Sequence, residues 1–324
     1  MLQGKELILA TKKYVKENRL KSWWLLFSSV FLLGLGYLGA LINFHWTLQL
    51  LSAIFTGLIV ARVFIIYHDY LHKTILQESL LAKVIFTVFG MFILAPTSIW
   101  KRSHDYHHNH NCKLHSASIG SFPLLTKKQF LTSSLKEKRH YLFIRHPLTI
   151  GFGYVFAFLW GMSLKSLVNS SGKHWDSFFA LVFHFGISVF VFIYLGPQAY
   201  LLGVLLPFVI YGGLGSYLFY AQHNYPDAKY KNKESWTYVH SALNSSSFMD
   251  LSPVLHWFTG NIGYHHIHHV NARIPFYNLP KVYKEMEEFQ NPGTTTLSPK
   301  DMYKCLRLKL WDAEKNKMIG LDEL

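Results

Sequence analysis

Four long uncharged stretches constrain the fold of this chain more than any other feature. Each contains no Asp, Glu, Lys or Arg and is rich in Phe, Leu and Ile; they are 22–42, 46–61, 177–196 and 197–222. A helix needs about 20 mostly apolar residues to cross the hydrocarbon core of a bilayer. We therefore predict an all-α integral membrane protein whose transmembrane helices are 22–42, 46–67, 177–196 and 198–221. Buried helices of a soluble protein are the alternative, but the stretches are too long and too numerous for it.

The net charge of +14 is concentrated in two segments. The stretch 5–21 holds six Lys or Arg and 101–145 holds nine, whereas the loops 43–46 and 195–198 hold none. Basic segments tend to stay in the cytoplasm, so we expect these two segments there and the short loops on the far side. The charge lies along the membrane edge, which favours anionic headgroups or an acidic electron donor over nucleic acid as partners.

The ends and the cysteines of the chain carry weaker signals. The first 21 residues are too charged for a signal peptide. Residues 5–19 instead suit a basic amphipathic helix that lies on the membrane, within an N-terminal interfacial segment 1–21. Cys112 and Cys305 are far apart and form no CxxC motif, which is consistent with a reducing compartment. We expect Cys112 to be a bystander thiol.

Three histidine clusters, each following an apolar stretch, are the main functional signal. One has the pattern H-x3-H at 68–72, and two have H-x2-H-H, at 104–108 and 265–269. Imidazole is a common ligand of transition metals. With the isolated His223, the candidate metal ligands are His68, His72, His104, His107, His108, His223, His265, His268 and His269.

Helical spacing indicates how these side chains can share metal ions. His68 and His72 are four residues apart and therefore lie on one face of a helix. Adjacent helical residues diverge by about 100°, so we expect the neighbours in the 107–108 and 268–269 pairs to serve different ions. Nine nitrogen ligands are too many for one ion and suit two, each with a position open for oxygen. Iron is favoured, because zinc is more often tetrahedral with fewer ligands.

A shared metal centre requires all clusters to lie on one side of the bilayer. The apolar segment 84–100, which contains Pro96, is therefore expected to lie at the interface or against other helices. Ser298 and Pro299 mark the start of a helix in the tail. We predict one domain of 324 residues with these parts: an interfacial segment 1–21, a hairpin 22–67, a cytoplasmic region 68–148, an interfacial segment 149–168, a second hairpin 177–221, and a cytoplasmic helical cap 222–324.

Some polar residues near the clusters are candidates for supporting roles. Asp69 and Asp105 each follow the first histidine of a cluster and can accept the second N–H of a ligating imidazole; surface charges are the alternative. Asn261 is a candidate to orient a ligand or a metal-bound water. His184 lies within an apolar stretch, either as a functional group or as a buried histidine with a hydrogen bond. His266 breaks the H-x2-H-H rule and is left out.

The ordered clusters resemble those of the membrane fatty acid desaturases. The segments QHNYPD at 222–227, LHWFTGNIGYHHIHHVNARIPFYNLP at 255–280 and RHPLTIGFG at 145–153 are similar to the bacterial acyl-lipid branch, related to the delta-12 and delta-5 types. The resemblance implies a non-haem di-iron centre, ligated by the nine histidines, with four crossing helices and a cytoplasmic cap. Because the chain has no HPGG-type haem motif, the electron donor is expected to be a separate protein, a ferredoxin or a cytochrome b5.

We therefore predict an enzyme that uses two ferrous ions and dioxygen to introduce a cis double bond into an acyl chain, most simply that of a membrane lipid. A di-iron hydroxylase or ketolase acting on lipids or carotenoids is the alternative, and it would add oxygen to its product. A metal transporter is disfavoured, because the histidine clusters lie outside the apolar stretches. The active site is expected on the cytoplasmic side of the membrane.

Overall fold

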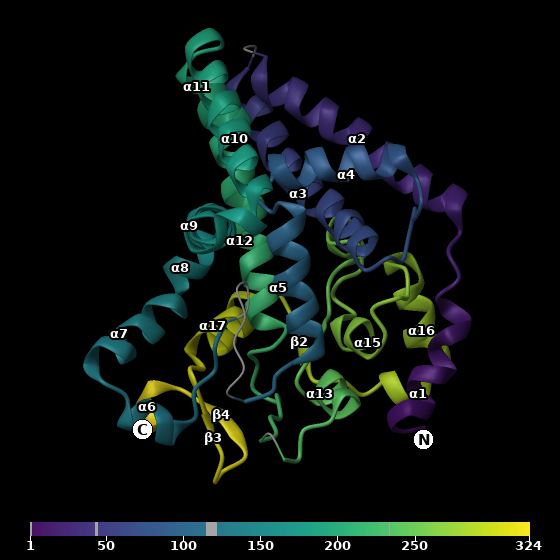
Figure 1. Ribbon diagram of the computed structural model, residues 1–324, viewed down its shortest axis with the longest axis vertical. Coiled ribbons are helices and arrows are strands. Elements are labelled where there is room, and N and C mark those ends of the chain that lie inside the picture. The colour runs from purple at the N-terminus through teal and green to yellow at the C-terminus, as the bar shows by residue number, and fades with distance from the viewer. Residues whose placement is uncertain (1, 43–44, 115–121, 233) are drawn as a thin grey trace.

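The computed structural model describes residues 2–42, 45–114, 122–232 and 234–324, so the loop 43–46 lies partly outside the described residues. The chain is mostly helical. Long helices extend from one end of the molecule, and short helices and strands gather at the other end, where both termini lie (Figure 1).

Four helical segments are long and apolar enough to cross a membrane, as predicted. They are α2 (Arg19–Leu41), α3 (Trp46–Leu71), α10 (Trp175–Tyr194) and the continuous segment Pro197–Ala221. The last consists of α11 (Pro197–Tyr200), η4 (Leu201–Leu205) and α12 (Leu206–Ala221).

Burial separates a central helix from peripheral ones. In its most apolar stretch, α3 is 67% buried, whereas α2 is 22% and α10 is 28% buried. Large apolar side chains such as Trp24, Phe31 and Ile193 are exposed on the peripheral helices. Apolar surface of this extent is unfavourable in water and suits the hydrocarbon of a bilayer. The chain is therefore a multi-pass membrane protein.

The central helix α3 packs between α2 and α12. At Gly57 a Cβ atom would lie 2.8 Å from Cβ of Ile210, so only glycine permits this approach of α3 to α12. Small residues at helix crossings are typical of membrane proteins, in which packing rather than water drives association. The tight contact fixes α3 relative to α12, and both helices end beside the histidine clusters.

The segment 84–100 forms no straight helix. Instead, α4 (Leu80–Phe92) and α5 (Thr97–Asn109) meet at an angle of 89°. Pro96 has an extended backbone at the start of α5, where its missing N–H is not needed. One face of α4, with Phe86 and Phe89, is buried, whereas Leu80 and Val84 on the other face are exposed. The bend directs α5 toward the ends of α3 and α12.

Between α5 and the second hairpin the chain forms short helices. They are α6 (Lys127–Thr132), α7 (Leu135–Ile144), α8 (Pro147–Gly151), η2 (Tyr154–Leu164), α9 (Lys165–Ser170) and η3 (Ser171–Lys173). None is among the four candidate spans. Tyr154 of η2 contacts His184 of α10, whose Nε2 lies 2.7 Å from the tyrosine hydroxyl oxygen. This contact agrees with the expectation that His184 is a buried, hydrogen-bonded histidine.

The N-terminal segment differs from the single helix predicted over 5–19. It forms α1 (Gly4–Ala10) and η1 (Thr11–Tyr14), and α2 already begins at Arg19. Asn18 caps α2, because its side chain accepts a hydrogen bond from the Lys21 N–H. The cap explains why the membrane helix starts three residues earlier than the uncharged stretch.

The C-terminal region is less helical than predicted. Its helical elements are α13 (Tyr238–Asn244), α14 (Pro253–Phe258), α15 (His265–Val270), η5 (Phe276–Asn278), α16 (Leu279–Glu285), η6 (Glu287–Phe289), α17 (Pro299–Arg307) and η7 (Leu321–Glu323). Ser298 caps α17 as expected. However, β1 (Phe248–Met249) pairs in parallel with β2 (Thr294–Thr295), and β3 (Leu310–Asp312) pairs antiparallel with β4 (Lys317–Ile319). The cap is mostly helical, and these two short strand pairs are the part that was not predicted; the turn at 313–316, with Asn316 at φ +50°, reverses the chain between β3 and β4.

Candidate metal centre

Four separate parts of the chain bring the nine histidines together. His68 lies in the last turn of α3, and His72 ends that helix. The second cluster lies on α5 and the third on α15, and His223 is the second residue after the end of α12. The bend before α5 and the end of α12 thus bring together residues that are far apart in sequence.

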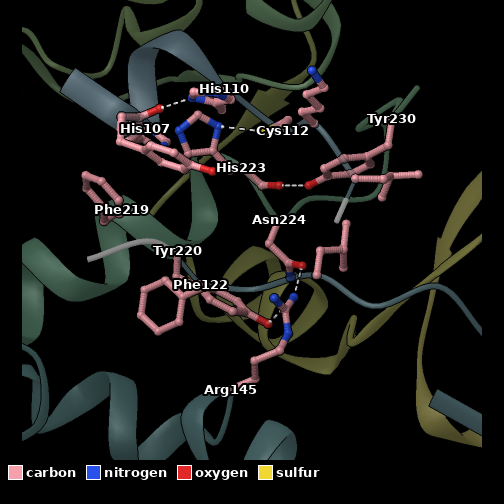
Figure 2. Close-up of a pocket in the computed structure, with 14 residues that line it drawn as sticks. His107, His110, Cys112, Phe122, Arg145, Phe219, Tyr220, His223, Asn224 and Tyr230 are labelled. Carbon is pink, nitrogen blue, oxygen red and sulfur yellow. Dashed lines mark hydrogen bonds between the residues drawn. The ribbon is translucent and has the colours of Figure 1, made fainter. Parts of the chain in front are cut away.

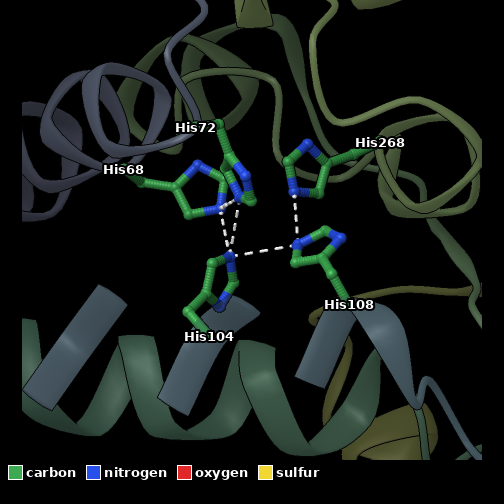
Figure 3. A group of neighbouring side chains, drawn as sticks. All are labelled: His68, His72, His104, His108 and His268. Carbon is green, nitrogen blue, oxygen red and sulfur yellow. Dashed lines mark hydrogen bonds between the residues drawn. The ribbon is translucent and has the colours of Figure 1, made fainter. Parts of the chain in front are cut away.

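Five histidines form the first group: His68, His72, His104, His108 and His268. Their Nε2 atoms face one another (Figure 3). The Nε2 of His104 lies 2.8 Å from that of His68, 2.9 Å from that of His72 and 3.1 Å from that of His108. The His68 and His72 nitrogens are 3.2 Å apart, and those of His108 and His268 are 3.1 Å apart.

Four histidines form the second group: His107, His223, His265 and His269. The Nε2 of His265 lies 2.9 Å from that of His223 and 3.0 Å from that of His269, and the latter lies 3.2 Å from that of His107. His223 joins this group although it belongs to no cluster in the sequence.

Adjacent histidines fall into different groups. His107 belongs to the group of four and His108 to the group of five, and His269 and His268 are divided in the same way. This is the divergence expected of neighbouring residues on a helix. The helices α5 and α15 therefore contribute to both groups and hold them side by side.

Burial favours the neutral form of eight of these imidazoles. Desolvation lowers the pKa of His223 to about 4. Desolvation, together with the neighbouring imidazoles, also lowers the pKa well below its usual value for His72, His104, His107, His108, His265, His268 and His269. A neutral imidazole offers a lone pair, which is the form that ligates a metal.

Hydrogen bonds alone do not account for the contacts. In the triangle of His68, His72 and His104, each Nε2 faces two others, yet a ring nitrogen is either a donor or an acceptor. At most two of the three contacts can be hydrogen bonds, so at least one contact joins two donors or two lone pairs. A metal ion that accepts the lone pairs removes this conflict. The Nδ1 atoms of five group members are also buried without a partner among the described residues: His104, His108, His265, His268 and His269.

The distances fit metal ions. With metal–nitrogen bonds of about 2.1 Å, neighbouring ligands at right angles are about 3.0 Å apart, and tetrahedral ones about 3.4 Å. The contacts of 2.8–3.2 Å agree with the right-angled arrangement. Ions that take six ligands would keep positions open beside five and four nitrogens. Both groups are therefore able to bind metal.

Hydrogen bonds orient one histidine in each group. The Nδ1 of His68 lies 3.2 Å from Oδ1 of Asp69, whose other oxygen accepts a hydrogen bond of 2.7 Å from the Phe276 N–H. In the second group, the Nδ1 of His223 lies 3.1 Å from the Ser245 carbonyl oxygen. Each partner keeps the proton on Nδ1 and directs the Nε2 lone pair into the group. The Ser245 carbonyl was missed in the sequence, because a backbone acceptor has no residue signature.

Three other residues that the sequence analysis named have different surroundings. Asp105 forms an ion pair of 2.5 Å with Lys101, and its side chain is 45% exposed. It is therefore a surface charge, which was the alternative interpretation. The amide nitrogen of Asn261 donates to the Phe276 carbonyl, and its φ of +56° places it in a tight turn. Cys112, expected to be a bystander, lies 3.3 Å from the Nδ1 of His223 and also contacts the Ser245 carbonyl.

An apolar cavity borders both groups. His68 and His104 of the first group and His265 of the second line it, and α3 and α12 contribute Phe64 and Leu218 to its walls. Trp100, also on the wall, stacks on the His104 ring at 5.0 Å and 14°. A narrow apolar space of this kind suits a hydrocarbon chain.

A second, polar pocket lies behind the group of four. Figure 2 shows His107 and His223 at one end of it and Arg145 at the other. Arg145 is only 1% exposed and donates hydrogen bonds to the side chain of Asn224 and the Pro123 carbonyl. Its Nε finds no partner among the described residues. The pocket is therefore cationic as well as polar.

Comparison with known proteins supports these observations. A family model described as "Fatty acid desaturase" matches residues 44–298. The chain belongs to the fatty acid desaturase family. This desaturase is 29% identical to a fatty acid desaturase of Bacillus subtilis over 291 aligned residues. The aligned region covers 88% of this chain and 80% of the relative.

Lipid-specific relatives are also similar to this desaturase. An sn-1 oleoyl-lipid 12-desaturase of Anabaena variabilis is 24% identical over 292 residues, 86% of this chain and 79% of its own length. An sn-1 acyl-lipid omega-3 desaturase (ferredoxin) of Nostoc is 25% identical over 283 residues, 82% of this chain and 74% of its own length. This desaturase is accordingly a membrane oxidoreductase of a di-iron family, with histidine groups able to bind two metal ions.

Proposed function

We propose that this chain is an acyl-lipid desaturase that introduces a cis double bond with two iron ions, dioxygen and electrons from a separate donor. The apolar cavity bordered by both histidine groups carries the proposal, because it brings an alkyl chain next to both metal positions. The lipid-linked substrates in the names of the Anabaena and Nostoc relatives support an acyl lipid. The Nostoc name also supports ferredoxin as the donor.

The ligand set of the proposal is the two histidine groups, five residues for one ion and four for the other. Bound iron would supply the oxidising power by reducing dioxygen with electrons from the donor. Asp69 and the Ser245 carbonyl hold the His68 and His223 rings in the ligating tautomer. The proposed role of Asn261 is to keep the turn before α15 in place through its bond to Phe276.

The cavity walls have the remaining tasks. Phe64, Trp100 and Leu218 present apolar surface, so they exclude water and hold methylene groups by packing. The shape of the cavity along α3 and α12 then decides which two carbons lie beside the histidine groups. The overall change is the loss of one hydrogen from each of two neighbouring methylenes, and dioxygen with two electrons and two protons leaves as two waters.

The proposed topology places both histidine groups on the cytoplasmic side. It rests on the basic segments 5–21 and 101–145, and on an even number of crossings between the clusters. In this topology α2, α3, α10 and Pro197–Ala221 cross, while α1 and the segment 149–168 lie at the interface. A cysteine label at Lys165 that is reached only from outside the cell would contradict it.

Lipid analysis tests the proposed activity. The chain is expressed in an aerobic host, and total fatty acids are compared by mass spectrometry with those from a His269→Ala variant. A new double bond that is absent in the variant supports desaturation and gives its position. A product that gains an oxygen atom would instead support the alternative, a lipid or carotenoid hydroxylase or ketolase.

A further inference from the structure

Two cavities of opposite character meet at Phe219. The apolar cavity along α3 and α12 and the cationic pocket near Arg145 share this side chain in their linings, and they share no other described residue. Phe219 lies in the last turn of α12, four residues before His223. It is half-buried, and the two spaces lie beside it.

The Phe219 ring also lies against both histidine groups. Its centre is 4.9 Å from that of His107 and 6.4 Å from that of His223, both in the group of four. It is 6.2 Å from that of His104, in the group of five. Trp100, on the wall of the apolar cavity, has its ring centre 6.4 Å from that of Phe219. The ring therefore stands where the two spaces approach the candidate metal positions.

The two spaces differ in their affinity for water. Arg145, Asn224 and Lys113 line the cationic pocket. Among the described residues the Arg145 guanidinium forms no ion pair with a carboxylate, and a charged group of this kind favours contact with water. The lining of the other cavity is almost wholly apolar apart from its histidines, Gln222 and Thr259. A hydrocarbon chain next to an oxidising centre must be kept from water, because side reactions otherwise compete.

We propose that Phe219 is a partition that keeps water of the cationic pocket out of the apolar cavity and thereby couples oxygen reduction to substrate oxidation. This inference rests on the proposed function. In the coupled reaction, dioxygen takes two electrons from the donor and two hydrogens from the acyl chain, and with two protons it forms two waters. In the uncoupled reaction, dioxygen takes only the two donor electrons and two protons and leaves as hydrogen peroxide.

The test measures coupling. Wild-type protein and the variants Phe219→Ala, Phe219→Leu and Phe219→Trp are supplied with ferredoxin, ferredoxin reductase, NADPH and phosphatidylglycerol vesicles with saturated and monounsaturated chains. NADPH oxidised, peroxide formed and double bonds made are recorded for each, together with metal content per chain. Losing the ring opens room for several waters of about 30 Å³ each, and we expect at least about a twofold rise in NADPH per double bond for Phe219→Ala. Phe219→Leu is expected to lie between this variant and wild type, and Phe219→Trp to stay coupled because it keeps the bulk.

A matched control changes one space only. Phe122 lines the cationic pocket and does not line the apolar cavity. In Phe122→Leu the NADPH used per double bond is expected to stay at the wild-type value, whatever the turnover. Equal uncoupling in Phe122→Leu and Phe219→Leu would overturn the proposal, as would a coupled Phe219→Ala protein.

Failures of the two proposals are distinguishable. If Phe219→Ala loses its metal, Phe219→Leu with normal metal content decides, and full coupling in that variant overturns the partition. A wild-type protein that makes no double bond contradicts the proposed function. A wild-type protein that makes double bonds, together with a Phe219→Ala protein that uses the same NADPH per double bond, contradicts the partition alone.

Discussion

Replacing Asp69 by Asn tests the orientation of His68. The Asp69 carboxylate is 1% exposed and accepts from two donors, the His68 ring and the Phe276 N–H. An amide has one acceptor oxygen, so at most one donor keeps its partner, and the negative charge is lost. Loss of such a partner lowers metal affinity by about 10- to 100-fold. This corresponds to about 1.4 to 2.8 kcal/mol.

Asp105 provides a matched control for Asp69. Both residues follow the first histidine of a cluster, but Asp105 pairs with Lys101 on the surface. Exposed ion pairs contribute about 0 to 1 kcal/mol to stability. We therefore expect Asp105→Asn to bind metal as the wild type does.

The assay is metal retention against a chelator. Purified proteins are dialysed against increasing concentrations of the chelator, and bound metal per chain is measured by plasma mass spectrometry. Circular dichroism confirms that each variant is folded. Asp69→Asn is expected to release metal at 10- to 100-fold lower chelator concentration. Equal retention in Asp69→Asn and wild type, or equal loss in Asp105→Asn, would refute the role of Asp69 in orienting His68.

Three further predictions concern the groups, a turn and a buried lysine. His107→Ala and His108→Ala are each expected to reduce bound metal by one ion per chain, and the double variant by two, because they belong to different groups; a double variant that keeps one ion would contradict this. Gly260 has φ +52°, and a Cβ there would lie 2.7 Å from a side-chain atom of Ile65. Left-handed strain alone should lower the free energy of unfolding by roughly 1–2 kcal/mol, and thermal melting should show a larger loss of stability than this for Gly260→Ala. The control is Gly4→Ala, because Gly4 has φ +53° but open space around it. Equal losses of stability in the two variants would argue against the prediction. Burial and a nearby guanidinium lower the pKa of Lys309 to about 8 from 10.5. The folded state therefore loses this proton at a lower pH than the unfolded state does, so the free energy of unfolding of the wild type should rise between about pH 8 and 10.5 relative to that of Lys309→Met. Parallel curves of unfolding free energy against pH for the two proteins would count against this prediction.

The membrane helices and the histidine ligand candidates could be predicted from the sequence because both are local signals. Uncharged length marks a span, and the spacing of His107 and His108 on one helix already implies that they diverge. The structure confirms the four spans within a few residues. The adjacent pairs also separate as expected.

Features that depend on contacts between distant parts of the chain could not be predicted from local sequence. Asp69 and Asp105 have the same local pattern, and only the position of Phe276, more than 200 residues later, distinguishes them. The partition at Phe219 depends on two cavities that no single segment forms. The hairpin of β3 and β4 was missed because its strands are only three residues long, too short for an alternating pattern to stand out.

The distribution of the ligands links metal binding to assembly of the fold. The group of five takes histidines from α3, α5 and α15, and the group of four takes them from α5, α15 and the end of α12. No group forms unless the C-terminal region is docked on the membrane helices. A metal ion that binds only the docked state would stabilise that docking by its binding free energy. Removal of metal should therefore loosen α15 and the end of α12 before it affects the contact of α2 with α3, which involves no histidine of either group.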